Sequence, residues 1–97
     1  MIPVEHITEV AGLYFRSVLV PYAGMQIDQH VHDHDHATLC ASGRARAWAD
    51  GVLLGEYNAG SAIEIKAGVY HKFEALEDGT RLVCVHDIAS AESAKRK

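Results

Sequence analysis

Short strand-like runs separated by turn residues are the feature that most constrains the fold of this chain. The run 13–20 is dense in β-branched and aromatic residues, which favour pleated strands, and 44–49 and 81–88 are further strand-like runs. No amphipathic helical pattern of ten or more residues precedes the C-terminal tail. Strands punctuated by turns every 8–12 residues are typical of an all-β sandwich or barrel.

Further strands and turns are expected between these runs. Asp50-Gly51 predicts a tight hairpin between 44–49 and the following run. Ile63 and Ile65 fall on one face of their run. The tail at 89–97 is expected to be a short helix or disordered. The other expected strands are 25–32, 38–41, 52–57, 61–66 and 70–75.

Length and charge limit the class of protein. A chain of 97 residues is expected to form one domain, 1–97. Its net charge of −4 offers no basic field for nucleic acid. No apolar run approaches the ~18–20 residues of a membrane span, and no signal peptide is visible, so a cytoplasmic protein is expected. Cys40 and Cys84 are isolated in apolar runs; buried reduced thiols are preferred, with a disulfide left open.

Four of the seven histidines lie within the stretch His-Val-His-Asp-His-Asp-His at 30–36. Neutral imidazole is the commonest protein ligand for transition metals, so a metal site is the first hypothesis. The alternative is a solvated polar loop. In a strand, His30 and His32 share a face and can converge on one ion. The facing of His34 and His36 stays open, because the aspartates suggest a bend or bulge.

The spacing around this stretch resembles the first of two motifs that mark the cupins. That motif reads Gly, five residues, His-x-His, three or four residues, Glu, six residues, Gly. The chain has Gly24, His30-Val31-His32, His36 and Gly43 at matching positions, about 24–43. His36 replaces the glutamate.

The second cupin motif reads Gly, five residues, Pro-x-Gly, two residues, His, three residues, Asn. Gly60, Gly68 and His71 keep this spacing, at about 60–75. Lys66 replaces the proline and Ala75 the asparagine. The two motifs together span 24–75, about half of the chain.

The resemblance implies a cupin-type double-stranded β-helix, a jelly-roll barrel, with a short C-terminal tail. It also implies one divalent transition metal, with Fe or Mn favoured and Ni, Zn, Cu or Co open. The implied ligands are His30, His32, His36 and His71, as in all-histidine cupins. Cupins of this size are often homodimers, and edge strands invite pairing.

A site of this kind implies a small-molecule substrate. Four neutral ligands leave two adjacent positions on an octahedral ion, which suits a dioxygenase, and the undiminished cation charge favours an anionic substrate. The alternatives are a metal-dependent isomerase, lyase or hydrolase, and a non-catalytic cupin that binds metal or a small ligand. Cupins host many chemistries, so the substrate and reaction are not identified.

The remaining candidate residues each have a structural and a functional interpretation. Pocket candidates are His34 as a proton carrier at the rim, Cys40 in line with His36, and Phe73 as an apolar wall beside His71. Core packing is preferred for Cys40 and Phe73, and also for three aromatic residues that could instead line a pocket: Trp48, Tyr57 and Tyr70. Two aspartates either orient imidazoles or are solvated: Asp33 and Asp35. Two histidines are expected to be structural: His6 and His86.

Overall fold

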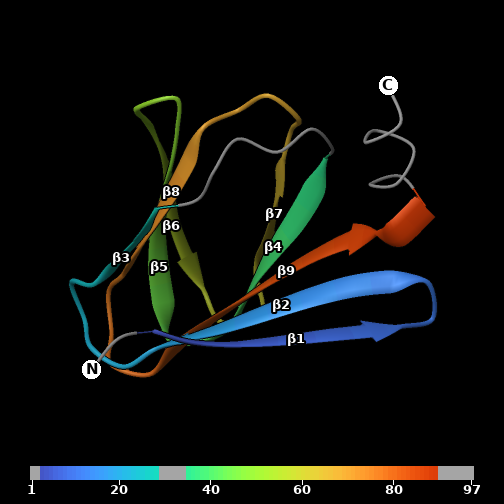
Figure 1. Cartoon of the computed structure of the whole chain (residues 1–97). Coiled ribbons are helices and arrows are strands. Elements are labelled where there is room, and N and C mark those ends of the chain that lie inside the picture. The colour runs from blue at the N-terminus through green and yellow to red at the C-terminus, as the bar shows by residue number, and fades with distance from the viewer. Residues whose placement is uncertain (1–2, 29–34, 90–97) are drawn as a thin grey trace.

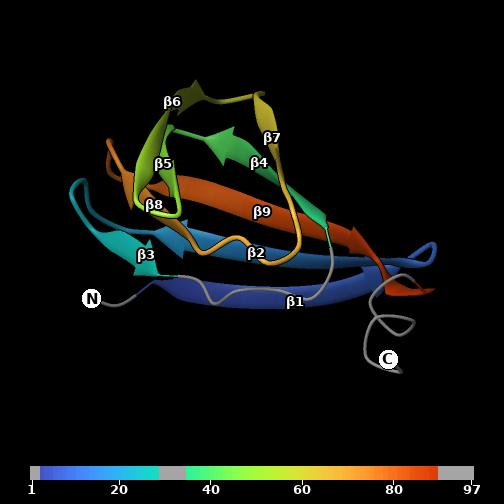
Figure 2. The ribbon, with the colours of Figure 1, turned by 90° about the horizontal axis from the view of Figure 1, so that it is seen from above.

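The chain folds into two antiparallel β-sheets that face one another (Figures 1 and 2). The structure is a computed structural model that describes residues 3–28 and 35–89. The five-stranded sheet has the order β1-β2-β9-β4-β7 and the four-stranded sheet the order β3-β8-β5-β6. The strands are β1 (Val4–Val10), β2 (Leu13–Val20), β3 (Gln26–Asp28), β4 (His36–Ser42), β5 (Arg44–Ala49), β6 (Val52–Asn58), β7 (Ala62–Ile65), β8 (His71–Ala75) and β9 (Thr80–Asp87).

The core lies between the sheets and is built by alternation along each strand. In β4, β8 and β9, every second side chain is buried, as expected for strands with one face on a core. The five-stranded sheet contributes Val18, Val20, Cys40, Ile65 and Leu82; the four-stranded sheet contributes Ile27, Ala45, Ala47, Phe73 and Ala75.

Small inward residues in β5 make room for large rings on β8. Ala47 pairs with Phe73 in the register, and Ala49 pairs with His71. Phe73 is 2% exposed and His71 is fully buried. Matching small residues to large ones is how a narrow barrel fills its interior without overpacking. The Ala-x-Ala-x-Ala pattern of β5 therefore admits an imidazole to the interior.

The expected all-β architecture is confirmed. The bounds of β2 and β5 match the predicted runs, and those of β6 to β9 differ from them by one residue at either end. Asp50 and Gly51 both have positive φ, at 50° and 81°, as a two-residue hairpin turn requires. The first half of the predicted run 25–32 contains β3, and its second half, 29–32, lies outside the described residues, as does nearly all of the tail 89–97. In the described part of the chain, no helix is long and apolar enough to cross a membrane.

Strand β1 was not predicted, and its surroundings explain why. All seven of its residues are exposed, since it forms the edge of the five-stranded sheet. Its apolar residues recur at every third position, at Val4, Ile7 and Val10, so the strand lacks the period-two pattern of a half-buried strand. The β1–β2 hairpin also extends past the end of the barrel (Figure 1).

Gly43 is the glycine that the packing requires most strictly. Its φ is +74°, and a Cβ there would collide with the Thr80 hydroxyl and lie 2.9 Å from the Thr80 Cα. Thr80 cannot move aside cheaply, because it is fully buried and its hydroxyl donates to the carbonyls of Glu77 and Arg44 at 2.8 and 3.1 Å.

Gly43→Ala is therefore expected to lower the free energy of unfolding by about 2–4 kcal/mol, combining a left-handed backbone with overpacking. Gly12→Ala is the matched control, because Gly12 has the same φ and a Cβ added there would meet no atom within 4 Å; it should lose only about 1 kcal/mol. Urea denaturation measures both. Equal losses would contradict a steric role for Thr80.

Candidate metal centre

His36 and His71 meet inside the barrel although they are 35 positions apart in the chain. His36 begins β4 and His71 begins β8, so the two rings come from opposite sheets. Their centroids are 5.0 Å apart, with the planes tilted by 51°. His36 is 5% exposed and His71 is fully buried. The two imidazoles thus lie next to each other in the buried space between the sheets.

The surroundings of His71 favour its neutral form. Burial is the largest cause that lowers the pKa of this imidazole; a contact with the Val69 carbonyl opposes it, and the charge of Arg16 lowers the pKa further. His71 Nδ1 lies 3.5 Å from the Val69 carbonyl oxygen. A proton on Nδ1 would donate to that oxygen, and this tautomer presents Nε2 as the nitrogen that can bind a cation.

The separation of the two rings fits a shared metal ion. With metal–nitrogen bonds of ~2.1 Å, ring centroids around one ion are about 4.6–5.3 Å apart for tetrahedral to octahedral angles; the observed 5.0 Å falls in this range. His30 and His32, the other predicted ligands, and His34 lie outside the described residues. Within the described part, no three His, Cys, Asp or Glu side chains form a group that could hold a metal.

The walls around the two imidazoles follow the predicted alternation. The Phe73 ring packs edge-on to His71 at 5.7 Å. Thr38 and Cys40 are buried on the same face of β4 as His36, and the Thr38 hydroxyl lies 3.5 Å from the Cys84 thiol. Both cysteines are buried free thiols. Phe73 and Thr38 therefore line the centre.

Cys40, a predicted pocket candidate, has a structural environment. Its thiol donates to the carbonyl oxygens of Ser42 and Gly43 at 3.4 and 3.6 Å. Burial raises the pKa of this thiol, the charge of Glu77 raises it further, and the Ser42 contact partly opposes both. A protonated thiol bonded to the β4–β5 turn acts as a small core residue.

Arg16 was missed by sequence reasoning. It shares the inward face of β2 with Val18 and Val20, and it stands opposite Cys84 in β9. Its Nε is 2.8 Å from a Glu5 carboxylate oxygen. The available signal was a single charge within a strand of otherwise apolar inward residues.

Tyr14 and His86 continue this inward face beyond Arg16. They are partners in the β2–β9 register, and their rings stack at 4.6 Å. His86 is thus the structural histidine that was expected. His6 differs, because it lies exposed on β1 and has no buried role.

Solved structures share this architecture. A cupin 2 conserved barrel domain protein from Salinispora arenicola CNS-205 superposes with a TM-score of 0.74 at 17% identity, covering 97% of this chain and 83% of that one. A conserved protein with a double-stranded beta-helix domain from Klebsiella pneumoniae gives 0.75 at 22%, covering 92% and 79%. A cupin superfamily protein from Desulfitobacterium hafniense DCB-2 gives 0.73 at 10%, covering 89% and 77%.

The chain has the cupin fold. The resemblance seen in the two sequence motifs is confirmed at this level. No protein-family model and no curated protein matches the chain.

The cupin motif glycines all occupy turns that need positive φ. The angles are 88° at Gly24, 74° at Gly43, 95° at Gly60 and 81° at Gly68. The spacing of these glycines therefore indicates where the chain turns. These turns bring β4 and β8, and with them His36 and His71, to the same end of the barrel.

Lys66, which replaces the usual cupin proline, joins the two motifs through ion pairs. Its ammonium lies 2.8 Å from Glu64 and 3.7 Å from Asp35. The Asp35 carboxylate also accepts the Ala67 N–H at 2.7 Å. Asp35 thus ties the segment before His36 to the loop before His71. The Asp35 side chain is 54% exposed, so of the two expected alternatives the solvated one fits it better than orienting an imidazole; Asp33 lies outside the described residues.

Two of the three aromatic residues that were candidates for a pocket lie outside the core. Tyr57 packs against the core as expected. Trp48 and Tyr70 instead line a hollow of about 430 Å³ on the outer face of the four-stranded sheet. The preferred core interpretation was therefore wrong for this pair, and the pocket interpretation was right.

Proposed function

We propose that this cupin is a metal-dependent dioxygenase that acts on a small, oxygenated, anionic organic substrate. The proposed ligands are His30, His32, His36 and His71, holding one divalent transition metal, with Fe or Mn favoured. Bound there, the ion would supply Lewis-acid and redox chemistry.

The meeting of the His36 and His71 rings carries this proposal. Burial of a polar ring costs free energy, yet this barrel buries two imidazole rings next to each other at a separation that suits a common ion. Burial keeps His71 neutral, which is the form that ligates. Phe73 packs against the His71 ring, and Thr38 is buried on the same face of β4 as His36, so both support a centre with little access to water.

Arg16 supports an anionic substrate. Its guanidinium lies on the inward face, close enough to His71 to lower the pKa of that imidazole. Guanidinium binds carboxylates and enolates through paired N–H donors. Glu5 now accepts from its Nε, and both side chains are partly exposed, at 29% and 44%. A substrate anion would compete with Glu5 for the Arg16 guanidinium, so Arg16 would determine the preference for anionic substrates.

Protein purified without a tag is expected to contain near-stoichiometric iron or manganese. His71→Ala and His36→Ala should each weaken Co²⁺ binding at least ~10-fold. Substitution of residues that only support metal ligands already weakens metal binding by this much, so the loss of a ligand should cost no less. His6→Ala is the matched control, since His6 is exposed on β1. Elemental analysis and calorimetry measure these quantities. Unchanged Co²⁺ affinity in both ligand variants would contradict the proposed centre.

Oxygen uptake by the iron- or manganese-loaded protein, screened over small hydroxylated or keto carboxylates and enolisable diketones, is expected for at least one compound. Arg16→Gln should raise the KM for that substrate at least ~10-fold with a smaller effect on kcat, because a charged hydrogen bond is lost. Glu5→Gln should lower the KM. Turnover without oxygen by the zinc form would instead indicate an isomerase, lyase or hydrolase, and thermal stabilisation without turnover a binding protein; either result contradicts the dioxygenase.

The proposal includes a cytoplasmic homodimer. Buried free thiols at Cys40 and Cys84 support a reducing compartment. The exposed edge strand β1 supports self-association: Val4, Ile7 and Val10 are 50–55% exposed there, and unpaired edges favour strand pairing.

Sedimentation is expected to give a dimer, and Val10→Lys should raise the dissociation constant at least ~10-fold by placing a charge on the edge. Val52→Lys on β6, an edge of the other sheet, is the control and should leave the dimer intact. A monomeric wild-type chain would contradict this part of the proposal.

A further inference from the structure

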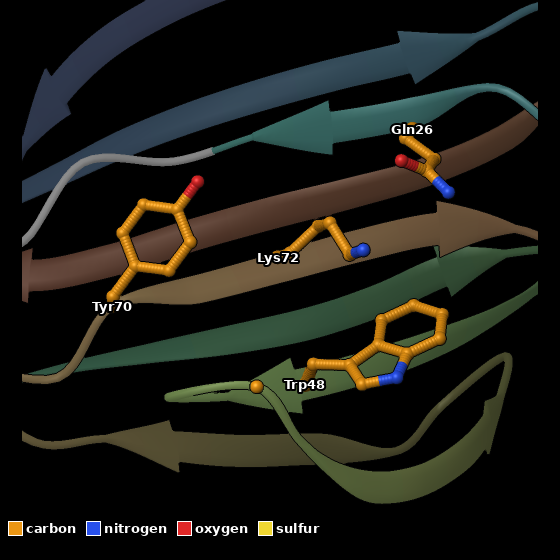
Figure 3. Close-up of a pocket in the computed structure, with 5 residues that line it drawn as sticks. Gln26, Trp48, Tyr70 and Lys72 are labelled. Atoms are coloured by element: carbon orange, nitrogen blue, oxygen red, sulfur yellow. The ribbon is translucent and has the colours of Figure 1, made fainter.

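The hollow on the outer face of the four-stranded sheet is separate from the barrel interior. Its volume is about 430 Å³, and it is lined by Gln26, Trp48, Gly51, Tyr70 and Lys72. Figure 3 shows Lys72 between Tyr70 on one side and Trp48 on the other, with Gln26 at the neighbouring strand. The strand alternation explains the separation, because Phe73 and His71 point inward from the same strand that presents Lys72 outward.

The hollow is held in shape by the backbone around it. Trp48 and Lys72 are direct partners in the β5–β8 register. Asp50 is joined to Tyr70 by two hydrogen bonds: its N–H donates to the Tyr70 carbonyl at 2.6 Å, and its carboxylate accepts the Tyr70 N–H at 3.0 Å. The Asp50-Gly51 turn and Tyr70 are therefore fixed relative to each other, which lowers the entropy lost when a ligand binds.

Lys72 is the cation among the residues that line the hollow. Lys72 Nζ lies 4.6 Å from the Trp48 ring centroid, and this contact orients the ammonium while leaving its donors to meet an acceptor. The nearest acidic neighbour on β8, Glu74, is held by Arg46. Among the described side chains Lys72 forms no ion pair. Asp28 pairs with Lys72 in the β3–β8 register, so a substitution at Asp28 is included in the test below.

We propose that this hollow binds a sugar acid, a polyhydroxylated ring that carries a carboxylate. The Lys72 ammonium would bind the carboxylate, the Gln26 amide and the Tyr70 hydroxyl would bind ring hydroxyls, and the apolar C–H face of the ring would contact the part of the indole beside the ammonium. A flat apolar acid could not use the amide and the phenol as hydrogen-bond partners. The site does not depend on the barrel metal.

Trp48 is the only tryptophan in the chain, so intrinsic fluorescence reports on this hollow directly. Titration of the full chain with sodium D-glucuronate at constant ionic strength should change the emission saturably, with a dissociation constant on the order of 1 mM for a ligand of this size. D-glucose, which lacks the carboxylate, and acetate, which lacks the ring, should each bind at least ~10-fold more weakly.

Lys72→Met should weaken glucuronate binding at least ~10-fold, and Tyr70→Phe should weaken it less, because it removes one neutral hydrogen bond. Arg44→Met, which removes a cation of the same sheet that does not line the hollow, is the matched control, and Asp28→Asn should bind at least as tightly as the wild type. Circular dichroism confirms that each variant is folded. Absence of a saturable change up to about 50 mM glucuronate, equal binding of glucose or acetate, or undiminished binding by folded Lys72→Met would overturn the proposal.

Discussion

The burial of two imidazole rings between opposing sheets is the constraint that governs this barrel. A charged imidazole would be strongly disfavoured there, so His71 is held neutral by its surroundings. The barrel accommodates the rings because β5 presents alanines inward, opposite His71 and Phe73. Larger residues at those alanines would displace the rings from the interior, so the composition of β5 and the chemistry of the site are coupled.

Polar contacts connect the ends of the strands that hold these rings. Asp35 and Lys66 connect the segment before His36 to the loop before His71. These residues depart from the usual cupin pattern or lie outside it, yet they join the two motifs in space. At the position where cupins usually have proline, Lys66 adds an ion pair with Asp35, and the next residue, Ala67, donates its N–H to the same carboxylate.

Much of the fold could be predicted from the sequence because the buried strands alternate cleanly and the turns contain glycine. The inward direction of Thr38, Cys40 and Phe73 followed from the same period. Strand β1 was not predicted because both of its faces are exposed, so its sequence has no alternation of buried and exposed residues. Arg16 was not predicted because its proximity to His71 arises from the facing of the two sheets, with Arg16 on β2 of one and His71 on β8 of the other. The outer position of Trp48 likewise depends on which face of β5 is buried, and an aromatic residue at strand spacing fits either face.

If imidazoles from both motifs bind one ion, X-ray absorption of the cobalt-loaded full chain should detect them around the metal. We expect at least three imidazole nitrogens around Co²⁺ at about 2.0–2.2 Å, with the imidazole scattering reduced in His71→Ala protein. A first shell of water and carboxylate oxygens, or imidazole scattering unchanged by loss of His71, would contradict a shared metal centre.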